Sequence, residues 1–301
     1  MNRFWIYQRE RFPLLGHGLV IVAFSASAIA FSAFARHAAL PAPWLLAAGF
    51  LSSLCSFAQM RIADEWKDAD EDRRYRPYRP VPRGLVTLRE LAWIGVPAGV
   101  IQLVVALAID PRLIIGLACV WAYFALMSQE FFAGRWLRAH PAIYVASHVA
   151  IVPMIDAYVS SFDWFVARVP APHALPWFLA VTFCNGLMVE VGRKLRAPRD
   201  EEHGVETYTA LWGVRRASAV WCVAFAATAI LASFAAAQIG VARIDAPLFV
   251  AAFTVAAAFA AWFVRRPATW IASRIETISG AWTVAMYGAL GLFPFALRGL
   301  P

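Results

Sequence analysis

Apolar runs long enough to cross a lipid bilayer recur along almost the whole chain. A membrane-spanning helix needs about 17–25 mainly apolar residues. Nine such runs can be traced, at approximately 12–35, 41–62, 90–109, 111–128, 140–160, 173–191, 216–238, 245–264 and 276–297. Because 61% of the 301 residues are hydrophobic and only 15% are charged, this apolar material exceeds what one soluble core can bury. The sequence therefore predicts an all-α, polytopic membrane protein with nine transmembrane helices.

The basic residues predict which side of the membrane each connection faces. If the N-terminus is cytoplasmic and the spans alternate, 22 of the 27 basic residues fall in inside segments. The outside segments hold the other five, which are Arg36, Arg112, Arg168, Arg243 and Arg298. Positive charge favours the cytoplasmic side, so we expect the N-terminus inside and the C-terminus outside. This rule also accounts for the net charge of +8 without nucleic acid as a partner.

Polar residues are concentrated in two segments, each following an apolar run. Of the 19 acidic residues, six lie within 64–72 and four within 200–206. We expect a single transmembrane domain over residues 1–301, with two cytoplasmic loops at about 63–89 and 190–215 that carry the functional groups. An active site built there would open to the cytoplasm from an inner or plasma membrane.

The first loop begins with carboxylates at helical spacing. Asp64, Asp68 and Asp72 recur every four residues, so a continuing helix places them near one face, with Glu65 three residues before Asp68. Carboxylates in such a row repel one another unless a cation bridges them, and hard oxygen ligands suit Mg²⁺. The alternative is a solvated acidic helix end that pairs with the arginines that follow it.

A basic, proline-rich segment follows directly. It reads Arg76-Pro77-Tyr78-Arg79-Pro80-Val81-Pro82-Arg83-Gly84. Proline lacks an N–H group and restricts the residue before it, so this segment predicts a stiff loop rather than a helix. Arg79 is the donor best placed to bind a phosphate. Carboxylates beside a rigid arginine loop are typical of a site for metal and phosphate.

These two patterns together resemble the signature of the UbiA superfamily of intramembrane prenyltransferases, NDxxDxxxD followed by an RPxRPxPxG-like segment. Here the first reads Asp64-Glu65-x-x-Asp68-x-x-x-Asp72, with Asp-Glu in place of the opening Asn-Asp, and the second matches at the expected distance. Nine spans with both signature loops cytoplasmic also match the family. The resemblance implies a UbiA-like bundle in which these four carboxylates bind Mg²⁺ and Asp68 and Asp72 serve in catalysis.

The second loop departs from the family pattern, which normally carries another stripe of aspartates. Asp200 falls on the last aspartate of that stripe, whereas Arg193 and Arg196 fall on the earlier two. A guanidinium group cannot ligate a cation, but it can bind phosphate through paired hydrogen bonds, with Lys194 as an added point charge. We expect metal at the first stripe, with Asp200 as a further ligand, and a basic phosphate clamp at the second. The alternatives are a loop that only anchors to anionic lipid and a family member that has lost activity.

Two further residues are candidates by position. Glu190 ends the sixth apolar run and could pair with Arg193 or act as a base. The family often has a tyrosine followed four residues later by a lysine in the loop after the fourth span. Here Phe131 and Arg135 take those places, so we expect Arg135 to contribute to diphosphate binding and the phenol to be missing.

The resemblance implies an enzyme that takes an isoprenoid diphosphate from the surrounding membrane lipids. It would move the isoprenoid group to a small-molecule or lipid acceptor, with Mg²⁺ assisting the departure of diphosphate. Three alternatives on the same fold stay open: phosphoribosyl-type transfer onto a lipid phosphate, a UbiA-type terpene cyclase, and a non-catalytic protein that binds or transports lipid diphosphates. Both Asp68→Ala and Arg196→Ala are expected to abolish turnover and leave the protein folded.

Overall fold

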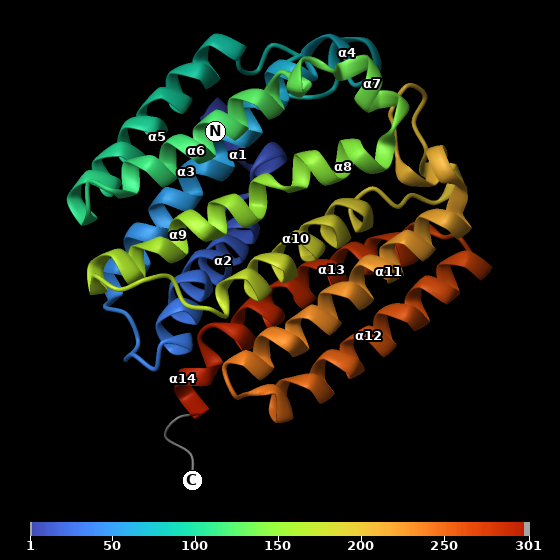
Figure 1. Cartoon of the computed structure of the whole chain (residues 1–301). Coiled ribbons are helices and arrows are strands. Elements are labelled where there is room, and N and C mark those ends of the chain that lie inside the picture. The colour runs from blue at the N-terminus through green and yellow to red at the C-terminus, as the bar shows by residue number, and fades with distance from the viewer. Residues whose placement is uncertain (1, 298–301) are drawn as a thin grey trace.

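The computed structural model describes residues 2–297, which form a bundle of helices without strands (Figure 1). The α-helices, together with the short 3₁₀ turns η1 and η2, have the following bounds: α1 Arg3–Arg11, α2 Leu14–Ala35, α3 Pro43–Lys67, α4 Ala69–Tyr75, α5 Leu88–Ile109, α6 Leu113–Ser128, η1 Glu130–Phe132, α7 Gly134–Ala139, α8 Pro141–Val149, α9 Ile151–Ala167, α10 Leu175–Gly192, η2 Pro198–Asp200, α11 Tyr208–Gln238, α12 Ala242–Arg265, α13 Thr269–Leu290 and α14 Phe293–Leu297.

Within residues 2–297, seven helical segments are long and apolar enough to cross a membrane, which identifies an integral membrane protein. They are α2, α3, α5, α8 with α9, α10, α11 and α12. The other two expected spans correspond to α6, which is apolar but only 16 residues long, and to α13. The number of nine spans and the orientation of the termini stay predictions.

α2 lies at the centre of the bundle, against α3, α9 and α13. Its alanine and serine residues allow neighbouring backbones to approach closely, and 72% of its apolar window is buried, compared with 17% in α5. Val96, Val100 and Val104 of α5 are exposed. Such valines are suited to contact with lipid tails, so α5 belongs to the periphery.

Two helices begin earlier than the apolar runs suggest. α13 covers residues 269–290 where a run was expected at 276–297, and it includes Arg274 and Glu276 as exposed residues of the helix. Charged side chains on the outer face of a helix lower its hydropathy without ending it, and this explains the error at α13. α11 begins at Tyr208, but its helical backbone is interrupted at Gly213, where φ is 76° and ψ 157°, so the run expected from residue 216 corresponds to the part after this break. Arg298 lies outside the described residues.

An ion pair fastens α9 to α2 at the end of the bundle remote from the signature loops. Asp163 is 3% exposed, and it accepts hydrogen bonds from Arg36 Nε at 2.8 Å and Nη2 at 2.7 Å and from Ser32 Oγ at 2.7 Å. The hydrogen bonds that the Arg36 guanidinium donates to Asp163 raise the pKa of Arg36 above its usual value. Three bonds to one buried carboxylate join the two helices firmly.

Asp163→Asn is therefore expected to lower the stability of the purified protein by about 1–3 kcal/mol, because an amide replaces the charged acceptor of these bonds. The midpoint of thermal unfolding in detergent would measure the loss. Asp110→Asn is the matched control, since Asp110 pairs with Arg112 at 2.8 Å on a surface where the arginine side chain is 57% exposed. Equal shifts in the two variants would contradict a special role for the buried pair.

Candidate active site

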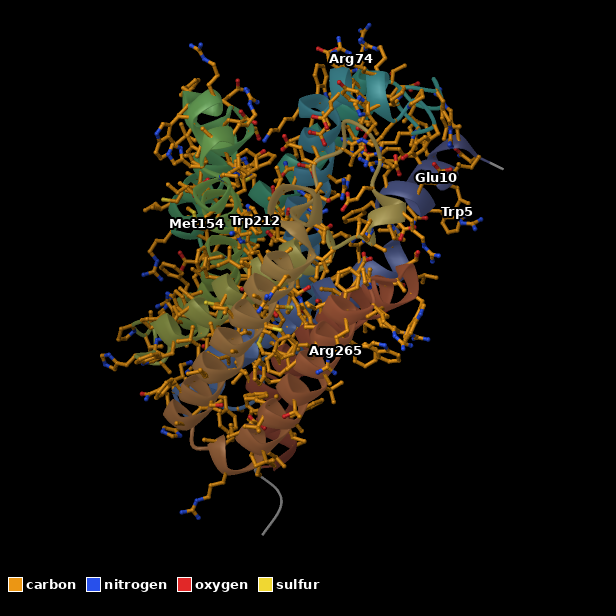
Figure 2. The ribbon with its side chains drawn as sticks, turned by 90° about the vertical axis from the view of Figure 1, so that its right-hand side faces the viewer. Trp5, Glu10, Arg74, Met154, Trp212 and Arg265 are labelled. Atoms are coloured by element: carbon orange, nitrogen blue, oxygen red, sulfur yellow. The ribbon has the colours of Figure 1, made fainter. Side chains whose placement is uncertain are left out.

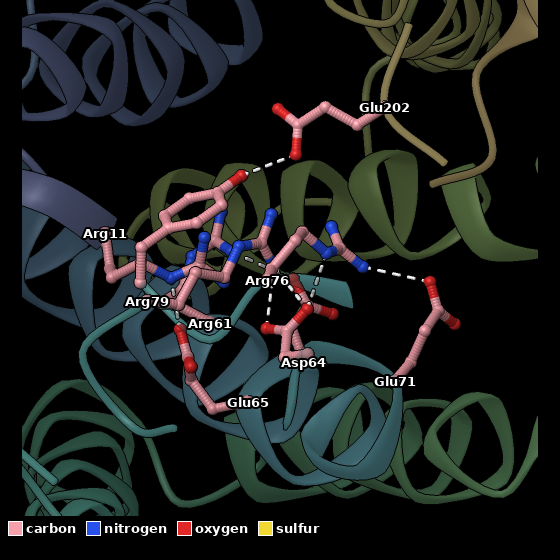
Figure 3. Close-up of polar contacts among 10 residues, drawn as sticks. Arg11, Arg61, Asp64, Glu65, Glu71, Arg76, Arg79 and Glu202 are labelled. Atoms are coloured by element: carbon pink, nitrogen blue, oxygen red, sulfur yellow. Dashed lines mark hydrogen bonds and ion pairs between the residues drawn. The ribbon is translucent and has the colours of Figure 1, made fainter. Parts of the chain in front are cut away.

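Both signature loops lie at the same end of the bundle and contact each other. The Tyr78 hydroxyl donates to Glu202 Oε2 at 2.7 Å (Figure 3), and this hydrogen bond raises the pKa of Tyr78 above its ordinary value. The Tyr75 ring packs edge-on against His203, with ring centroids 5.8 Å apart. Gly204 has φ +75°, and a Cβ there would overlap the Tyr75 ring. Glycine at this position thus lets the first loop pack closely against the second.

The N-terminal helix α1, which the sequence pattern did not predict, joins the same end. Glu10 accepts from Arg83 Nη2 at 2.8 Å, and Arg11 Nε donates to Glu65 at 2.5 Å. Figure 2 shows Trp5 and Glu10 at the end of the molecule that also carries Arg74. α1 therefore braces both the proline-rich loop and the first carboxylate motif.

The first motif keeps its helical spacing although α3 ends at Lys67. The Asp68 N–H donates to the Asp64 carbonyl at 2.9 Å, and the Asp72 N–H donates to the Asp68 carbonyl at 2.8 Å. The three aspartates therefore follow one another up one face, as the spacing predicts. Their side chains have different surroundings, however, and these surroundings decide what each can bind.

Asp72 is enclosed by arginines of the proline-rich loop. Its side chain is 2% exposed, and both of its oxygens accept from Arg79 Nη1, at 2.9 and 2.7 Å. Arg76 Nε lies 2.7 Å from the same carboxylate and also pairs with Glu71 (Figure 3). In this arrangement the two arginines neutralise Asp72, and Asp72 holds Arg79 in position. Asp72 therefore stabilises the conformation of the proline-rich loop.

Asp64 and Asp68 are the carboxylates of this motif that remain accessible. The Asp64 side chain is 53% exposed, and its contact with Arg61 is a long one of 3.6 Å. Asp68 is half-buried and makes no side-chain hydrogen bond or ion pair with any residue from 2 to 297. Glu65 lies beside them with one buried oxygen, Oε2, that has no hydrogen-bond partner. A cation bound between Asp64 and Asp68 would neutralise these two carboxylates.

Mg²⁺ typically binds through one or two carboxylates and completes its shell with water and substrate phosphates. Asp64 and Asp68 fit that requirement. Nowhere in residues 2–297 do three Asp, Glu, His or Cys side chains come together as a metal site. The larger ligand set expected from the sequence is thus not gathered in this structure; it comprised Asp64, Glu65, Asp68, Asp72 and Asp200.

The second motif forms a charged cluster at the end of α10. Glu190 accepts from Arg193 Nε at 2.6 Å, pairs with Lys194 Nζ at 3.0 Å, and accepts from the Tyr208 hydroxyl at 3.3 Å. The Arg193 side chain remains 47% exposed. Burial alone would lower the pKa of Arg193, but Glu190 and, across the site, Asp64 raise it above the ordinary value. Arg193 therefore lies within electrostatic reach of Asp64 in the first motif.

Arg196 lies in the connection between α10 and η2, and Asp200 is the last residue of η2. The Arg196 N–H donates to Thr209 Oγ1 at 2.9 Å, while its guanidinium donates to the Leu195 carbonyl at 3.3 Å. Asp200 has one buried oxygen, Oδ2, without a hydrogen-bond partner. Arg135, the other expected diphosphate ligand, is exposed on α7 and makes no side-chain hydrogen bond or ion pair with the described residues.

Sequence reasoning missed the wall that α8 adds to this end. Lys67 Nζ contacts the Tyr144 hydroxyl at 2.5 Å, Glu130 Oε1 at 3.1 Å and His148 Nε2 at 3.3 Å. A phenol is therefore present here, supplied by Tyr144, although residue 131 is phenylalanine. Tyr144 and His148 lie 77 and 81 positions from Lys67, so no local spacing joins them. The sequence feature that could have indicated these contacts is Lys67, a single lysine inside the acidic motif.

Glu130 reaches Lys67 from a strained turn. Glu130, Phe131 and Phe132 all have positive φ values, of 48°, 53° and 58°. The left-handed region costs a residue with a Cβ about 1–2 kcal/mol, and three in succession are rare. Gly134 follows, and a Cβ there would overlap the Glu130 carboxylate. Backbone strain of this kind is concentrated at functional sites.

Comparisons with known proteins agree with this architecture. The structure resembles the apo form of a UbiA homologue from Aeropyrum pernix K1, at 15% identity over 90% of this chain and 96% of that chain, with a TM-score of 0.68. It also resembles a digeranylgeranylglyceryl phosphate synthase, at 13% identity over 97% and 99% of the two chains, with a TM-score of 0.61. No curated protein matches by sequence. The model of the UbiA prenyltransferase family matches residues 21–295. With the aspartate motif, the proline-rich arginine loop and the fold in agreement, the chain belongs to the UbiA prenyltransferase family.

Proposed function

We propose that this protein transfers a prenyl group from an isoprenoid diphosphate to a small-molecule or lipid acceptor, at a site that opens to the cytoplasm. The observation that carries the proposal is the presence of opposite charges at one end of a UbiA-family bundle. Asp64 and Asp68 are accessible carboxylates, and the Arg193 guanidinium at the end of α10 lies within electrostatic reach of Asp64. A magnesium diphosphate needs both an oxygen-rich side and a cationic side.

On the oxygen-rich side, Asp64 and Asp68 would hold Mg²⁺, which supplies positive charge to the departing diphosphate. Glu65, through its buried oxygen without a partner, would add negative charge beside them. Asp72 would act through the arginine loop, because its carboxylate holds Arg79 and Arg76. This division gives the four carboxylates of the motif three different tasks.

On the cationic side, Arg193 and Lys194 would bind diphosphate oxygens directly, with Arg196 and Arg79 as neighbouring donors. Glu190 holds Arg193 and Lys194 in place, and since two cations neutralise it, it is better suited to positioning them than to removing a proton. Guanidinium groups bind phosphate through paired, charge-assisted hydrogen bonds. Asp200, with one unpaired oxygen, and Arg135 stay candidates for metal and diphosphate binding respectively.

A basic second motif would also suit a donor that carries an additional phosphate. Phosphoribosyl transfer onto a lipid phosphate is therefore the second candidate function. The observation that favours it is the presence of Arg193 and Arg196 where the family pattern has carboxylates, with Lys194 as an additional cation. It differs from prenyl transfer in the donor, and hence can be separated from it experimentally.

The test is to incubate the purified full chain in detergent with a panel of isoprenoid diphosphates, with and without Mg²⁺, and to measure pyrophosphate release and binding. Release that depends on Mg²⁺ is the expected result. Tight binding without release, even after cell-extract acceptors are added, would contradict catalysis and favour a binding or transport role. Failure to bind any isoprenoid diphosphate, combined with release from phosphoribosyl diphosphate, would replace the proposal with the second candidate.

A further inference from the structure

The α8 wall of the site contacts Lys67, the last residue of α3, which the proposed donor chemistry has not used. Lys67 is followed directly by Asp68 in the chain, and its ammonium contacts Glu130, Tyr144 and His148. Its Nζ also lies 4.9 Å from the centre of the Tyr144 ring. One carboxylate, one phenol and one imidazole thus occupy the three donor directions of this ammonium group.

This wall lies within electrostatic reach of the candidate active site. Tyr144 is close enough to Asp68, and His148 close enough to Glu190, for the charges of these carboxylates to act on the two side chains. Tyr144 and Tyr208 lie within electrostatic reach of each other as well. Lys67 belongs to the first motif by sequence, and its ammonium group contacts residues of α8 that are near both motifs.

The anionic partner of Lys67 is held from outside that wall. Glu130 belongs to the turn with three successive positive φ values, and its second oxygen pairs with Arg138 Nη1 at 3.2 Å. The absence of a side chain at Gly134 leaves the space that the Glu130 carboxylate fills. The contact between Glu130 and Lys67 is thus built with some conformational cost, and it neutralises a cation at the edge of an anion-binding site.

We propose that Lys67 binds the diphosphate group of the substrate, and that the diphosphate takes over from Glu130 as its anionic partner. The proposal rests on the proposed function and adds to the donor site a subsite formed by Lys67 of α3 beside α8. Tyr144 and His148 keep the ammonium group oriented toward the site, both when Lys67 pairs with Glu130 and when it pairs with the diphosphate. The exchange involves ion pairs only, and no covalent bond changes.

Binding of inorganic pyrophosphate in the presence of Mg²⁺, measured by titration calorimetry on the detergent-solubilised full chain, tests this subsite. Lys67→Met is expected to weaken binding by about tenfold or more, as the loss of a charge-assisted hydrogen bond does. Lys67→Arg should restore most of the affinity. Glu130→Gln is expected to tighten binding by about threefold, because it removes the competing carboxylate. Arg73→Gln is the matched control, since it removes a cation whose side chain is 72% exposed and pairs with the exposed Asp70, and it should leave binding unchanged.

The opposite signs at Lys67 and Glu130 distinguish a ligand-binding role from a structural one. If both variants weaken binding to the same extent, or if Lys67→Met binds as the wild type does, the pair only braces the helices and the inference is wrong. The unfolding midpoint of each variant shows whether a loss of pyrophosphate affinity comes from misfolding. If Lys67→Met misfolds, the affinity of Lys67→Arg tests the inference in its place. The proposed function fails together with the inference only if the wild-type protein does not bind magnesium pyrophosphate at all.

Discussion

Asp68→Ala is expected to lower the rate of pyrophosphate release from an isoprenoid diphosphate by at least about a hundredfold. Positioning a metal ion against a leaving group contributes several kcal/mol to catalysis, and Asp68 is the accessible carboxylate that has no other side-chain partner in the described part of the chain. For the same reason, its removal should leave the unfolding midpoint nearly unchanged. Activity should be measured over a range of Mg²⁺ concentrations.

Asp70→Ala provides the matched control for this prediction. Asp70 lies two residues after Asp68, and its side chain is 97% exposed and pairs with Arg73. The Asp70→Ala variant should retain full activity with the wild-type dependence on Mg²⁺. An Asp68→Ala protein that keeps both the rate and the metal dependence of the wild type would show that Mg²⁺ is not held by this carboxylate.

Arg193→Gln is the second substitution with a large expected effect. We expect a loss of about a hundredfold in kcat/KM for the isoprenoid diphosphate, because the charge-assisted hydrogen bonds of Arg193 would strengthen as charge develops on the diphosphate. The single substitution also leaves Glu190, 19% exposed, with one cation fewer. The double variant Arg193→Gln with Glu190→Gln restores the charge balance, and the loss of activity should persist in it.

Two other arginines of the same segment define how far the clamp extends. Arg199→Gln should be neutral, since the Arg199 side chain is 71% exposed and bonds to Thr269 on α13. Arg196→Ala is expected to abolish turnover if the clamp includes both arginines that stand where the family pattern has aspartates. If the two single variants, Arg196→Ala and Arg193→Gln, both keep full activity, there is no phosphate clamp at the second motif.

Hydropathy alone predicted the helical architecture and most helix positions. The run at 90–109 corresponds to α5, and the run at 173–191 to α10, within two residues at each end. Errors arose where charged side chains occupy the outer face of a helix, as Arg274 does in α13. A hydropathy window averages over all faces of a helix, so it moves the boundary even though the backbone hydrogen bonds continue.

For the candidate site, local spacing correctly placed Asp64, Asp68 and Asp72 along one face. It could not indicate that arginines enclose Asp72, because this depends on how the proline-rich loop folds back. The Lys67 wall was missed for a related reason. Its partners come from a different helix and a distant turn, and only the packing of the bundle brings them together.

The contact between the two signature loops has a consequence for the order in which the site is completed. Tyr78 and Glu202 are 124 positions apart, and a membrane protein is inserted span by span as the chain is synthesised. The first half of the site is therefore made long before the second, and contacts between distant segments form late in folding. Until α10 and the second loop have been synthesised, Asp64 and Asp68 lack the cationic group of Arg193, whereas Asp72 already has Arg76 and Arg79 beside it. The nascent protein thus remains unable to hold a diphosphate between its two halves until most of its helices are in the membrane.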